Sequence, residues 1–540
     1  MNRAERDLRR RVRTHQRSGK ILSTLRCVDQ LIDRGVATAN DWRIMGVGLC
    51  QLGEFSQAIG ALQNCLREVP DDVEARYELA RAWYKLGDVD SSIAVSESLA
   101  QDIDNPNFLM GLATILPGAP SASNLRIHNV RRKYAEVVRK HERVTLPKPT
   151  TRRVNPPKLR IGYLSAHLHH PNYMKPVWPL LNGHDPDRFE IHLFDDSNVP
   201  SPDWHWLDTK AEKYAVGKLS NAQVAEQIRR AEIDILVDLS AFSEPKRLGV
   251  FVHRPAAIQV AWFNSFATSG LEEFDYLIGD RFVFPKAEQA FYTETVIPLA
   301  TSYLTFHVAH DAPPIGESPC HRDGSFTFGC LATQYKITPG VIDAWSQILK
   351  AANSASLVLA NRELQSKCNQ QYVLDQFKRR DVDESRIRFL PPADHYEFLK
   401  YYDQIDLTLD TFPYNGGTTT MESLWQGVPV LSFNGDRWAS RTSRSIIHNT
   451  HLSKFCPETL EAMIQMAIDY ASVKSKQAEL PIIRNEMRDQ LVNSDACNTD
   501  QFVKEMETAL ATLVLGRETG NESHASNDHS DVAPFDSSKK

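Results

Sequence analysis

A 34-residue spacing between two similar helical segments is the feature that most constrains the N-terminal part of this chain. Leu52-Gly53 is followed 34 residues later by Leu86-Gly87, and each pair divides two amphipathic segments. A period of this length is typical of stacked helical hairpins, each of which buries its apolar face against the next. The spacing therefore predicts an α-helical repeat unit, which we assign to residues 1–143.

After residue 158 the pattern changes to short apolar runs separated by helical segments. The runs that come first are LRIGYLS, FEIHLFD, IDILVDL, IQVAWF and FDYLIGD. The alternation restarts near residue 325 with SFTFGCLAT, followed by ASLVLAN, RIRFLP, IDLTLDTF and VPVLSF. Such alternation predicts parallel sheets covered by helices on both faces. We therefore expect two Rossmann-like α/β domains, 159–315 and 316–475. Ligands of such sheets bind at the C-terminal ends of the strands, so we expect a site in the cleft between the two domains.

Three further segments complete the predicted organisation. Four prolines within residues 144–158 are incompatible with a continuous helix, so this stretch is expected to be a linker. Residues 476–516 are expected to form C-terminal helices. Residues 517–540 are rich in Ser, Asn and Asp and contain few large apolar side chains, which predicts a disordered tail.

The composition excludes several classes of protein. The chain has 62 Lys and Arg against 68 Asp and Glu, a net charge of -6. This balance gives no general attraction to nucleic acid or anionic lipid, and no apolar run approaches the roughly 20 residues of a membrane span. Eight cysteines without a C-x-x-C pair are too few for a disulfide framework or a zinc site. We therefore expect no nucleic-acid partner, no membrane partner, no bound metal and a cytoplasmic location.

The segment 405–427, IDLTLDTFPYNGGTTTMESLWQG, carries the most informative binding pattern. A predicted strand ends near Phe412, after which Gly416-Gly417 and three threonines open a helix. The glycines allow a ligand to approach the backbone closely, and the free amides at a helix N-terminus favour an anion such as a diphosphate. The alternative is an ordinary N-cap followed by an acidic first turn. Spacing alone does not decide between them.

Several long motifs in a fixed order resemble one enzyme family. They are HRPAAIQVAWF at 253–263, ATQYKITPGVIDAWSQIL at 332–349 and LDTFPYNGGTTTMESLWQGVPVLSFNGDRWASR at 409–441. Together with the preceding repeats, which resemble tetratricopeptide repeats, they resemble the O-linked N-acetylglucosamine transferase family. Within it, the bacterial members related to the plant SPINDLY protein are the most similar. The resemblance implies a GT-B fold of two Rossmann-like domains, with a nucleotide sugar as donor substrate and no separate cofactor.

The resemblance also implies roles for particular residues. Lys336 in TQYKI matches the lysine that contacts the donor diphosphate, and Thr333 replaces a Gln or Asn beside it. His170 matches the catalytic-region histidine, whose near-neutral pKa suits handling the acceptor hydroxyl proton or hydrogen-bonding to phosphate. Phe398 takes the position of a histidine that stacks on uracil. The family's donor loop, with threonines at the diphosphate and a carboxylate at the ribose, maps onto Gly416, Gly417, Thr418, Thr419 and Glu422.

Other positions depart from the family pattern. Residues 264–270 read NSFATSG where the family usually has Gly-Tyr-Pro-Gly-Thr-Ser/Thr-Gly. Met174 stands where a second histidine often follows, and His395 is a second candidate for stacking on the base. His167 and His169, which flank the predicted site, are expected to be solvent-exposed loop residues. These departures leave the donor sugar, the base and the acceptor less constrained than the fold.

The sequence as a whole predicts an inverting protein O-glycosyltransferase. It would transfer N-acetylglucosamine from UDP-GlcNAc to Ser or Thr of a protein acceptor, which the repeats would present to the cleft. One alternative keeps the enzyme class with GDP-fucose as donor, as the resemblance to SPINDLY allows. Another is a binding scaffold that has lost catalysis, for which the altered loop 264–270 is the motivation.

Overall fold

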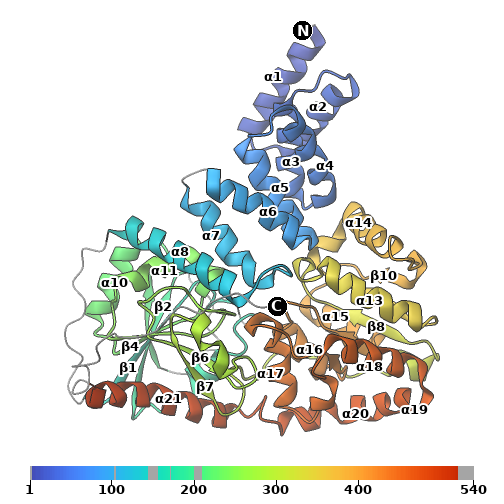
Figure 1. Ribbon diagram of the computed structural model, residues 1–540. Coiled ribbons are helices and arrows are strands. Elements are labelled where there is room, and N and C mark those ends of the chain that lie inside the picture. Colours follow the sequence, from blue (N-terminus) through green and yellow to red (C-terminus); the bar gives the residue numbers. More distant parts are fainter. Residues whose placement is uncertain (1–2, 103–104, 144–155, 171, 200–209, 521–540) are drawn as a thin grey trace, which may run out of the picture.

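The N-terminal part of the chain forms a column of helices in the computed structural model (Figure 1). The structure describes residues 3–102, 105–143, 156–170, 172–199 and 210–520. Gly53 (φ 80°) and Gly87 (φ 90°) end the first helix of each repeat in the left-handed conformation, which glycine adopts without a Cβ clash. The predicted helical repeat is therefore confirmed. Its helices are α1 (Arg3–Arg17), α2 (Ile21–Asp33), α3 (Ala39–Leu52), α4 (Phe55–Glu68), α5 (Val73–Leu86), α6 (Val89–Asp102), α7 (Pro106–Ile115) and α8 (Asn124–Glu142).

The first Rossmann-like domain is built on a seven-stranded parallel sheet. Its strands are β1 (Leu159–Ser165), β2 (Phe189–Asp195), β3 (Ala211–Ala215), β4 (Ile235–Asp238), β5 (Ile258–Ala261), β6 (Tyr276–Asp280) and β7 (Thr295–Leu299), and its helices include α9 (Trp178–Gly183), α10 (Asn221–Arg230) and α11 (Leu248–Val252). The strand order β3-β2-β1-β4-β5-β6-β7 is that of a doubly wound fold. The sequence did not predict β3 or β7. Both are edge strands, and β3 lacks a run of buried apolar side chains.

The second Rossmann-like domain has a five-stranded parallel sheet in the order β10-β9-β8-β11-β12. Its strands are β8 (Thr327–Cys330), β9 (Ser356–Leu359), β10 (Ile387–Phe389), β11 (Leu407–Leu409) and β12 (Val430–Leu431). All five coincide with predicted apolar runs. The accompanying helices are α12 (Pro319–Arg322), α13 (Pro339–Ala351), α14 (Lys367–Lys378), α15 (His395–Leu399), α16 (Thr418–Trp425), α17 (Thr442–His448) and α18 (Leu460–Ser472).

The last helices return to the first domain. After α19 (Lys474–Gln477) and α20 (Glu479–Val492), the long helix α21 (Thr499–Gly520) runs beneath the first sheet (Figure 1). Glu507 of α21 accepts hydrogen bonds from the backbone amide of Asp185 at 2.8 Å and pairs with His184 at 3.2 Å. This helix therefore ties the C-terminal end of the chain to the N-terminal Rossmann-like domain.

The repeat unit packs against both Rossmann-like domains. On the second, the Asn369 amide donates to the carbonyl of Gly53 at 2.8 Å. On the first, the buried Arg131 of α8 donates to the carbonyl oxygens of Ser265 and Thr268 at 3.2 and 2.6 Å. The repeats thus span the cleft between the two domains.

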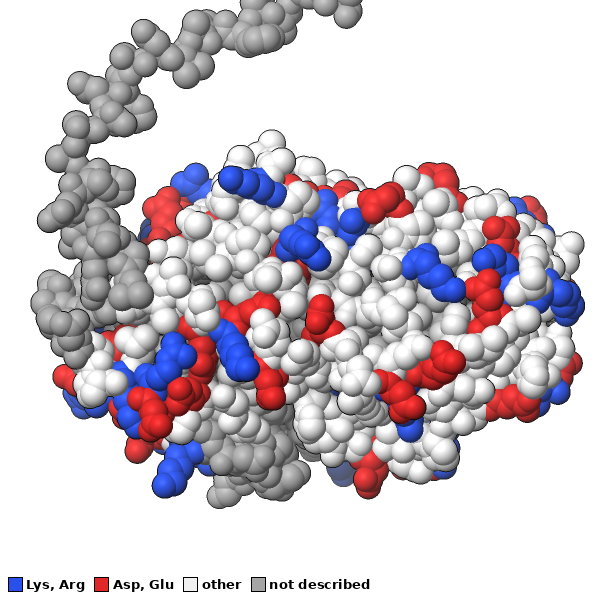
Figure 2. Space-filling view, turned by 90° about the horizontal axis from the view of Figure 1, so that it is seen from below, with Lys and Arg blue, Asp and Glu red and all other residues white. Residues whose placement is uncertain are grey.

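The surface charge is mixed, as the composition indicates. Figure 2 shows basic and acidic side chains interspersed on the face seen from below. Every helix in the described ranges is too short or too polar to cross a lipid bilayer. Residues 144–155 of the predicted linker and 521–540 of the predicted tail lie outside those ranges, while α21 continues to Gly520.

Candidate functional site

The candidate site is formed by loops that follow central strands of both sheets. In the second sheet β8 and β11 are neighbours. The strand after β8 along the chain, β9, lies on one side of this pair, and the strand after β11, β12, lies on the other. Such a switch point opens a crevice at the C-terminal strand ends. Lys336 follows β8 and Gly416 follows β11, so both lie at this crevice. His170 follows β1, beside the corresponding switch point between β1 and β4.

The loop between β11 and α16 is held in place by buried polar groups. The amide of Gly416 donates to Asp410 at 3.0 Å, and Ser432 donates to the other oxygen of the same carboxylate at 2.7 Å. A Cβ on Gly416 would lie 2.4 Å from Oγ1 of Thr420, so this position has no room for a side chain. The loop is therefore tightly packed and fixed by hydrogen bonds to a buried carboxylate.

Helix α16 begins without a side-chain cap. Its N-cap residue is Gly417, and Thr418 is its first helical residue. The alternative interpretation, an ordinary side-chain N-cap followed by an acidic first turn, is therefore wrong, because the first turn contains no acidic residue. Thr418 and Thr419 are half-buried at this terminus. Uncapped amides and the helix dipole together make this end suitable for an anion.

Lys336 points from the β8 loop toward the loop after β11. Its Nζ donates to the carbonyl of Asn415 at 2.7 Å and lies 4.1 Å from the ring centroid of Tyr414. Desolvation lowers the pKa of Lys336 to about 8, although the charge of Asp410 acts in the opposite direction. The ammonium group contacts a carbonyl and a ring rather than a carboxylate in this position. It is a desolvated positive charge at the crevice, suited to an anionic group.

Glu422 is buried in an ion-pair cluster that joins the two domains. Nζ of Lys175, from the loop between β1 and α9, lies 2.8 Å from Oε1 of Glu422. Nε2 of His395 lies 2.8 Å from the same oxygen. Burial raises the pKa of Glu422, but the hydrogen bond from His395 and the charge of Lys175 outweigh it and lower that pKa. The predicted ribose-binding carboxylate is therefore ionised and faces both domains.

Lys175 is a site residue that the sequence did not predict. It is 7% exposed, and its partner is 247 residues away along the chain. The signal available in the sequence was its place in the loop after β1, the same loop that carries His170. His395 was considered only for stacking on a base, whereas its ring nitrogen bonds to Glu422.

Two further predicted residues, Thr333 and Phe398, have no contact with this cluster among the described interactions. Thr333 is exposed at the N-cap of the short 3₁₀ helix Gln334–Lys336. Phe398, one turn after His395 in α15, is half-buried with its ring 5.9 Å from that of Tyr401. Their contacts do not assign either residue a ligand, so the roles predicted for them stay predictions.

The loop after β1 carries three histidines with different environments. His170 is the exposed one, and its ring lies 3.9 Å from that of His169. The expectation that His167 and His169 are solvent-exposed is wrong, because both are half-buried. Nε2 of His167 is 3.2 Å from the hydroxyl of Ser243, and desolvation lowers the pKa of His167 to about 4. Desolvation, with a contribution from His169, also lowers the pKa of His170. His170 is thus neutral at pH 7 and accessible from solvent.

Comparison with known proteins identifies the family to which this arrangement belongs. The family model described as glycosyl transferase family 41 matches residues 133–311 and 322–506, and a tetratricopeptide-repeat model matches residues 49–115. The chain belongs to glycosyltransferase family 41. Its matched region contains every site residue described above, from His170 to Glu422.

Individual members of the family are similar over different lengths. The chain is 30% identical over 296 residues to the probable UDP-N-acetylglucosamine--peptide N-acetylglucosaminyltransferase SPINDLY of Hordeum vulgare, covering 55% of this chain and 31% of that protein. It is 28% identical to the Arabidopsis thaliana protein of the same name, covering 66% of this chain and 39% of the relative. The chain thus spans about a third of the length of these relatives.

A solved bacterial structure matches nearly the whole chain. A mutant of the Thermobaculum terrenum O-GlcNAc transferase superposes with a TM-score of 0.78 and 27% sequence identity, covering 94% of this chain and 98% of that chain. This match confirms the predicted architecture of helical repeats followed by two Rossmann-like domains of the GT-B type.

Proposed function

We propose that this family 41 glycosyltransferase transfers a sugar from a nucleoside diphosphate donor to a Ser or Thr hydroxyl of a polypeptide. The observation that carries the proposal is that Lys336 bonds to the carbonyl of Asn415, two residues before the uncapped N-terminus of α16, at one switch-point crevice. A desolvated ammonium and free helix amides bind a diphosphate in the ground state and stabilise the charge that develops on it during transfer. Thr418 and Thr419 add hydroxyl donors at the same end.

The reaction that fits these groups inverts the anomeric carbon. The acceptor oxygen forms a bond to that carbon while the bond to the donor diphosphate oxygen breaks. The nucleoside diphosphate leaves with the electron pair, and Lys336 neutralises its added charge. The hydroxyl proton passes to the departing phosphate or to water, with the neutral, accessible His170 as an additional acceptor.

The donor is proposed to be UDP-N-acetylglucosamine. The names of the SPINDLY relatives and of the bacterial structure support this choice. Glu422, ionised and held by Lys175 and His395, would accept hydrogen bonds from ribose hydroxyls with its second oxygen. Phe398 and Thr333 would border the base and the diphosphate respectively. We also propose a soluble, cytoplasmic protein, in line with its composition.

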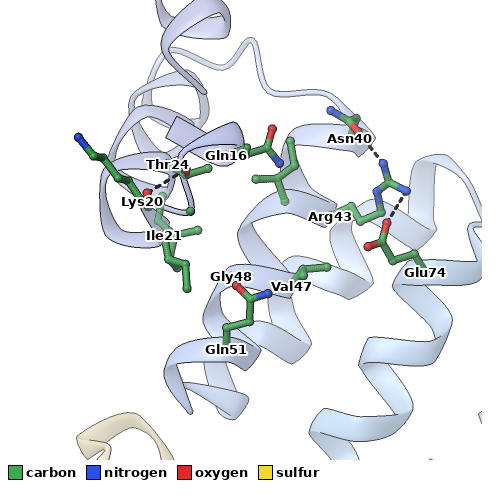
Figure 3. Close-up of a pocket in the computed structure, with 13 residues that line it drawn as sticks. Gln16, Lys20, Ile21, Thr24, Asn40, Arg43, Val47, Gly48, Gln51 and Glu74 are labelled. Atoms are coloured by element: carbon green, nitrogen blue, oxygen red, sulfur yellow. Dashed lines mark hydrogen bonds and ion pairs between the residues drawn. The ribbon is translucent and has the colours of Figure 1, made fainter. Parts of the chain in front are cut away.

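The acceptor polypeptide is proposed to bind along the repeats. A cavity of about 560 Å³ opens on α1, α2 and α3, and Figure 3 shows Gln16, Asn40 and Gln51 among its lining residues. Amide side chains both donate and accept, so they suit the backbone of an extended peptide. Arg43 is held there by Asn40 and Glu74, each at 2.8 Å. Its fixed guanidinium provides one charged contact.

The proposal is tested by incubating the purified chain with each nucleotide sugar and a lysate depleted of small molecules. Release of UDP from UDP-GlcNAc, with an N-acetylhexosamine mass on Ser or Thr, is the expected result. Release of GDP from GDP-fucose, with a deoxyhexose mass, would instead assign the alternative donor. A protein that binds and turns over neither donor would support the scaffold alternative and refute the proposed activity.

A further inference from the structure

The end of the repeat unit lies directly against the loop that carries Lys336. Helix α5 ends at Leu86, and its carbonyl accepts a hydrogen bond from the side chain of Gln334 at 3.3 Å. Gln334 is fully buried, and its amide oxygen accepts from Asn361 at 3.2 Å. One side chain thus connects the repeat unit to the short helix that positions Lys336.

An aromatic stack reinforces this connection. The ring of Tyr84, in the last turn of α5, is stacked on Tyr335 with centroids 4.9 Å apart and planes 16° apart. Tyr335 immediately precedes Lys336 and lies 6.0 Å from Tyr414, the ring over which the ammonium sits. Aromatic contacts therefore lead from the repeat unit, through the stacked pair and then a tilted one, to the aromatic partner of Lys336.

Gly87 makes the contact between the two backbones possible. It adopts φ 90°, and a Cβ at this position would lie 2.2 Å from the carbonyl oxygen of Ile337. The residues on either side of Lys336 are thus in contact with α5: Tyr335 through its ring and Ile337 through its backbone. Gly118, a second glycine of the repeat unit, also lies close to the site. A Cβ at this position would be 3.2 Å from Cδ1 of Tyr414.

These contacts border a cavity beside the proposed site. A cavity of about 170 Å³ is lined by residues from all three parts of the protein. The repeat unit contributes Tyr84 and Thr114, the first Rossmann-like domain Tyr173 and Asn264, and the second Tyr335 and Tyr414. The repeats therefore form one wall of the cleft rather than lying apart from it.

We propose that the C-terminal turn of α5 positions Lys336 for the reaction, with Tyr84 as a positioning residue. This inference rests on the proposed function, because it assigns Lys336 to the donor diphosphate. An acceptor polypeptide that binds the repeats would then contact the same rigid unit that holds the catalytic lysine. A misplacement of about 1 Å at a reacting group can cost 10²-fold in rate.

The test compares three variants on donor hydrolysis and UDP binding. Tyr84→Ala removes the stack, Tyr84→Phe keeps the ring, and Tyr77→Ala is a matched control two turns earlier on α5, where the ring is 41% exposed. Gly87→Ala is less informative, since strain at φ 90° would destabilise the helix end itself. We expect Tyr84→Ala to lower kcat about 10- to 100-fold with little change in donor KM. Tyr84→Phe and Tyr77→Ala should behave like the wild type.

Three outcomes would overturn the inference in distinguishable ways. A wild type that hydrolyses the donor alongside a Tyr84→Ala variant with unchanged kcat refutes the positioning role alone. A wild type that neither binds UDP nor hydrolyses any donor refutes the proposed function and, with it, this inference. A fall in kcat that Tyr84→Phe also shows would attribute the effect to the hydroxyl and would equally refute the stacking argument.

Discussion

The two Rossmann-like domains present very different loops to the cleft. In the second, the loop after β11 is fixed by Asp410, which accepts from Gly416 and Ser432. In the first, the loop after β1 leaves His170 exposed, with neighbouring histidine rings as its close contacts. A rigid loop is suited to a ligand of constant shape, whereas an exposed side chain can adjust to a variable one. We therefore propose that the second domain holds the donor and the first domain meets the acceptor.

The largest effect on kcat should come from a substitution in the second Rossmann-like domain. Lys336→Ala removes the desolvated ammonium that we assign to the diphosphate, and we expect kcat to fall about 10²- to 10³-fold. Steady-state kinetics of donor hydrolysis measure this change. A variant with full activity would show that the diphosphate does not bind at this loop. It would also refute the functional difference that we propose between the two domains.

Glu422→Gln should have the next largest effect, on stability as well as on donor KM. It leaves Lys175 buried beside a neutral partner, and removing one member of a buried pair costs about 3–5 kcal/mol in the free energy of unfolding. Urea denaturation measures this loss. Glu226→Gln, which breaks an exposed pair with Arg230, is the matched control and should change stability by less than about 1 kcal/mol.

Adding Lys175→Met to Glu422→Gln tests whether the two domains are coupled through this pair. The second change removes the unpaired charge, so the double variant should recover part of the lost stability. Strictly additive losses would show that the contact between Lys175 and Glu422 contributes no coupling across the cleft.

The dependence of kcat/KM on pH should follow the ionisation of Lys336. Because the pKa of Lys336 is lowered to about 8, its positive charge is present below that pH and is lost as the pH rises through it. We expect kcat/KM to decline on the alkaline side of pH 8. Lys336→Arg, which remains charged, should lose this decline in whatever activity it retains.

The lowered pKa of Lys336 affects the free energy of unfolding in the opposite direction from activity. The pKa of Lys336 in the folded protein is lower than its ordinary value of 10.5, so the unfolded state binds more protons between about pH 8 and 10.5. This group alone therefore makes folding more favourable as the pH rises through that window. Alkaline loss of activity without unfolding is the expected combination, and simultaneous unfolding would contradict it.

The smallest effect should come from the exposed histidine. His170→Ala is expected to lower kcat about tenfold, below the 10²–10⁴ range of an indispensable general base, because solvent or the departing phosphate can take the proton. The measurement is acceptor glycosylation at saturating donor. A loss of 10³-fold or more would make His170 the base and give the first domain a chemical role equal to that of the second.

The fold could be predicted largely because its signals are local. The 34-residue spacing and the apolar runs set the helices and the central strands, and the glycine pair marked the loop after β11. Edge strand β3 escaped prediction because its charged side chains remain exposed. The placement of α21 beneath the first sheet also could not be read from its own residues.

The parts of the site that were missed depend on contacts between distant segments. Lys175 meets Glu422 across 247 residues, and Gln334 reaches Leu86 across 248. No local pattern encodes such a contact, because it arises only when three separately folded units pack together. His167 was misjudged for the same reason, since Ser243 and its surroundings come from another loop.

The central claim is that Lys336 and the N-terminus of α16 form a nucleoside diphosphate site. Isothermal titration of the purified chain with UDP, beside the Lys336→Ala variant, tests it most directly. We expect saturable one-site binding to the wild type and at least a tenfold weaker affinity for the variant, a difference of about 1.4 kcal/mol. Absence of UDP binding to the wild type, or equal affinity for both proteins, would contradict it.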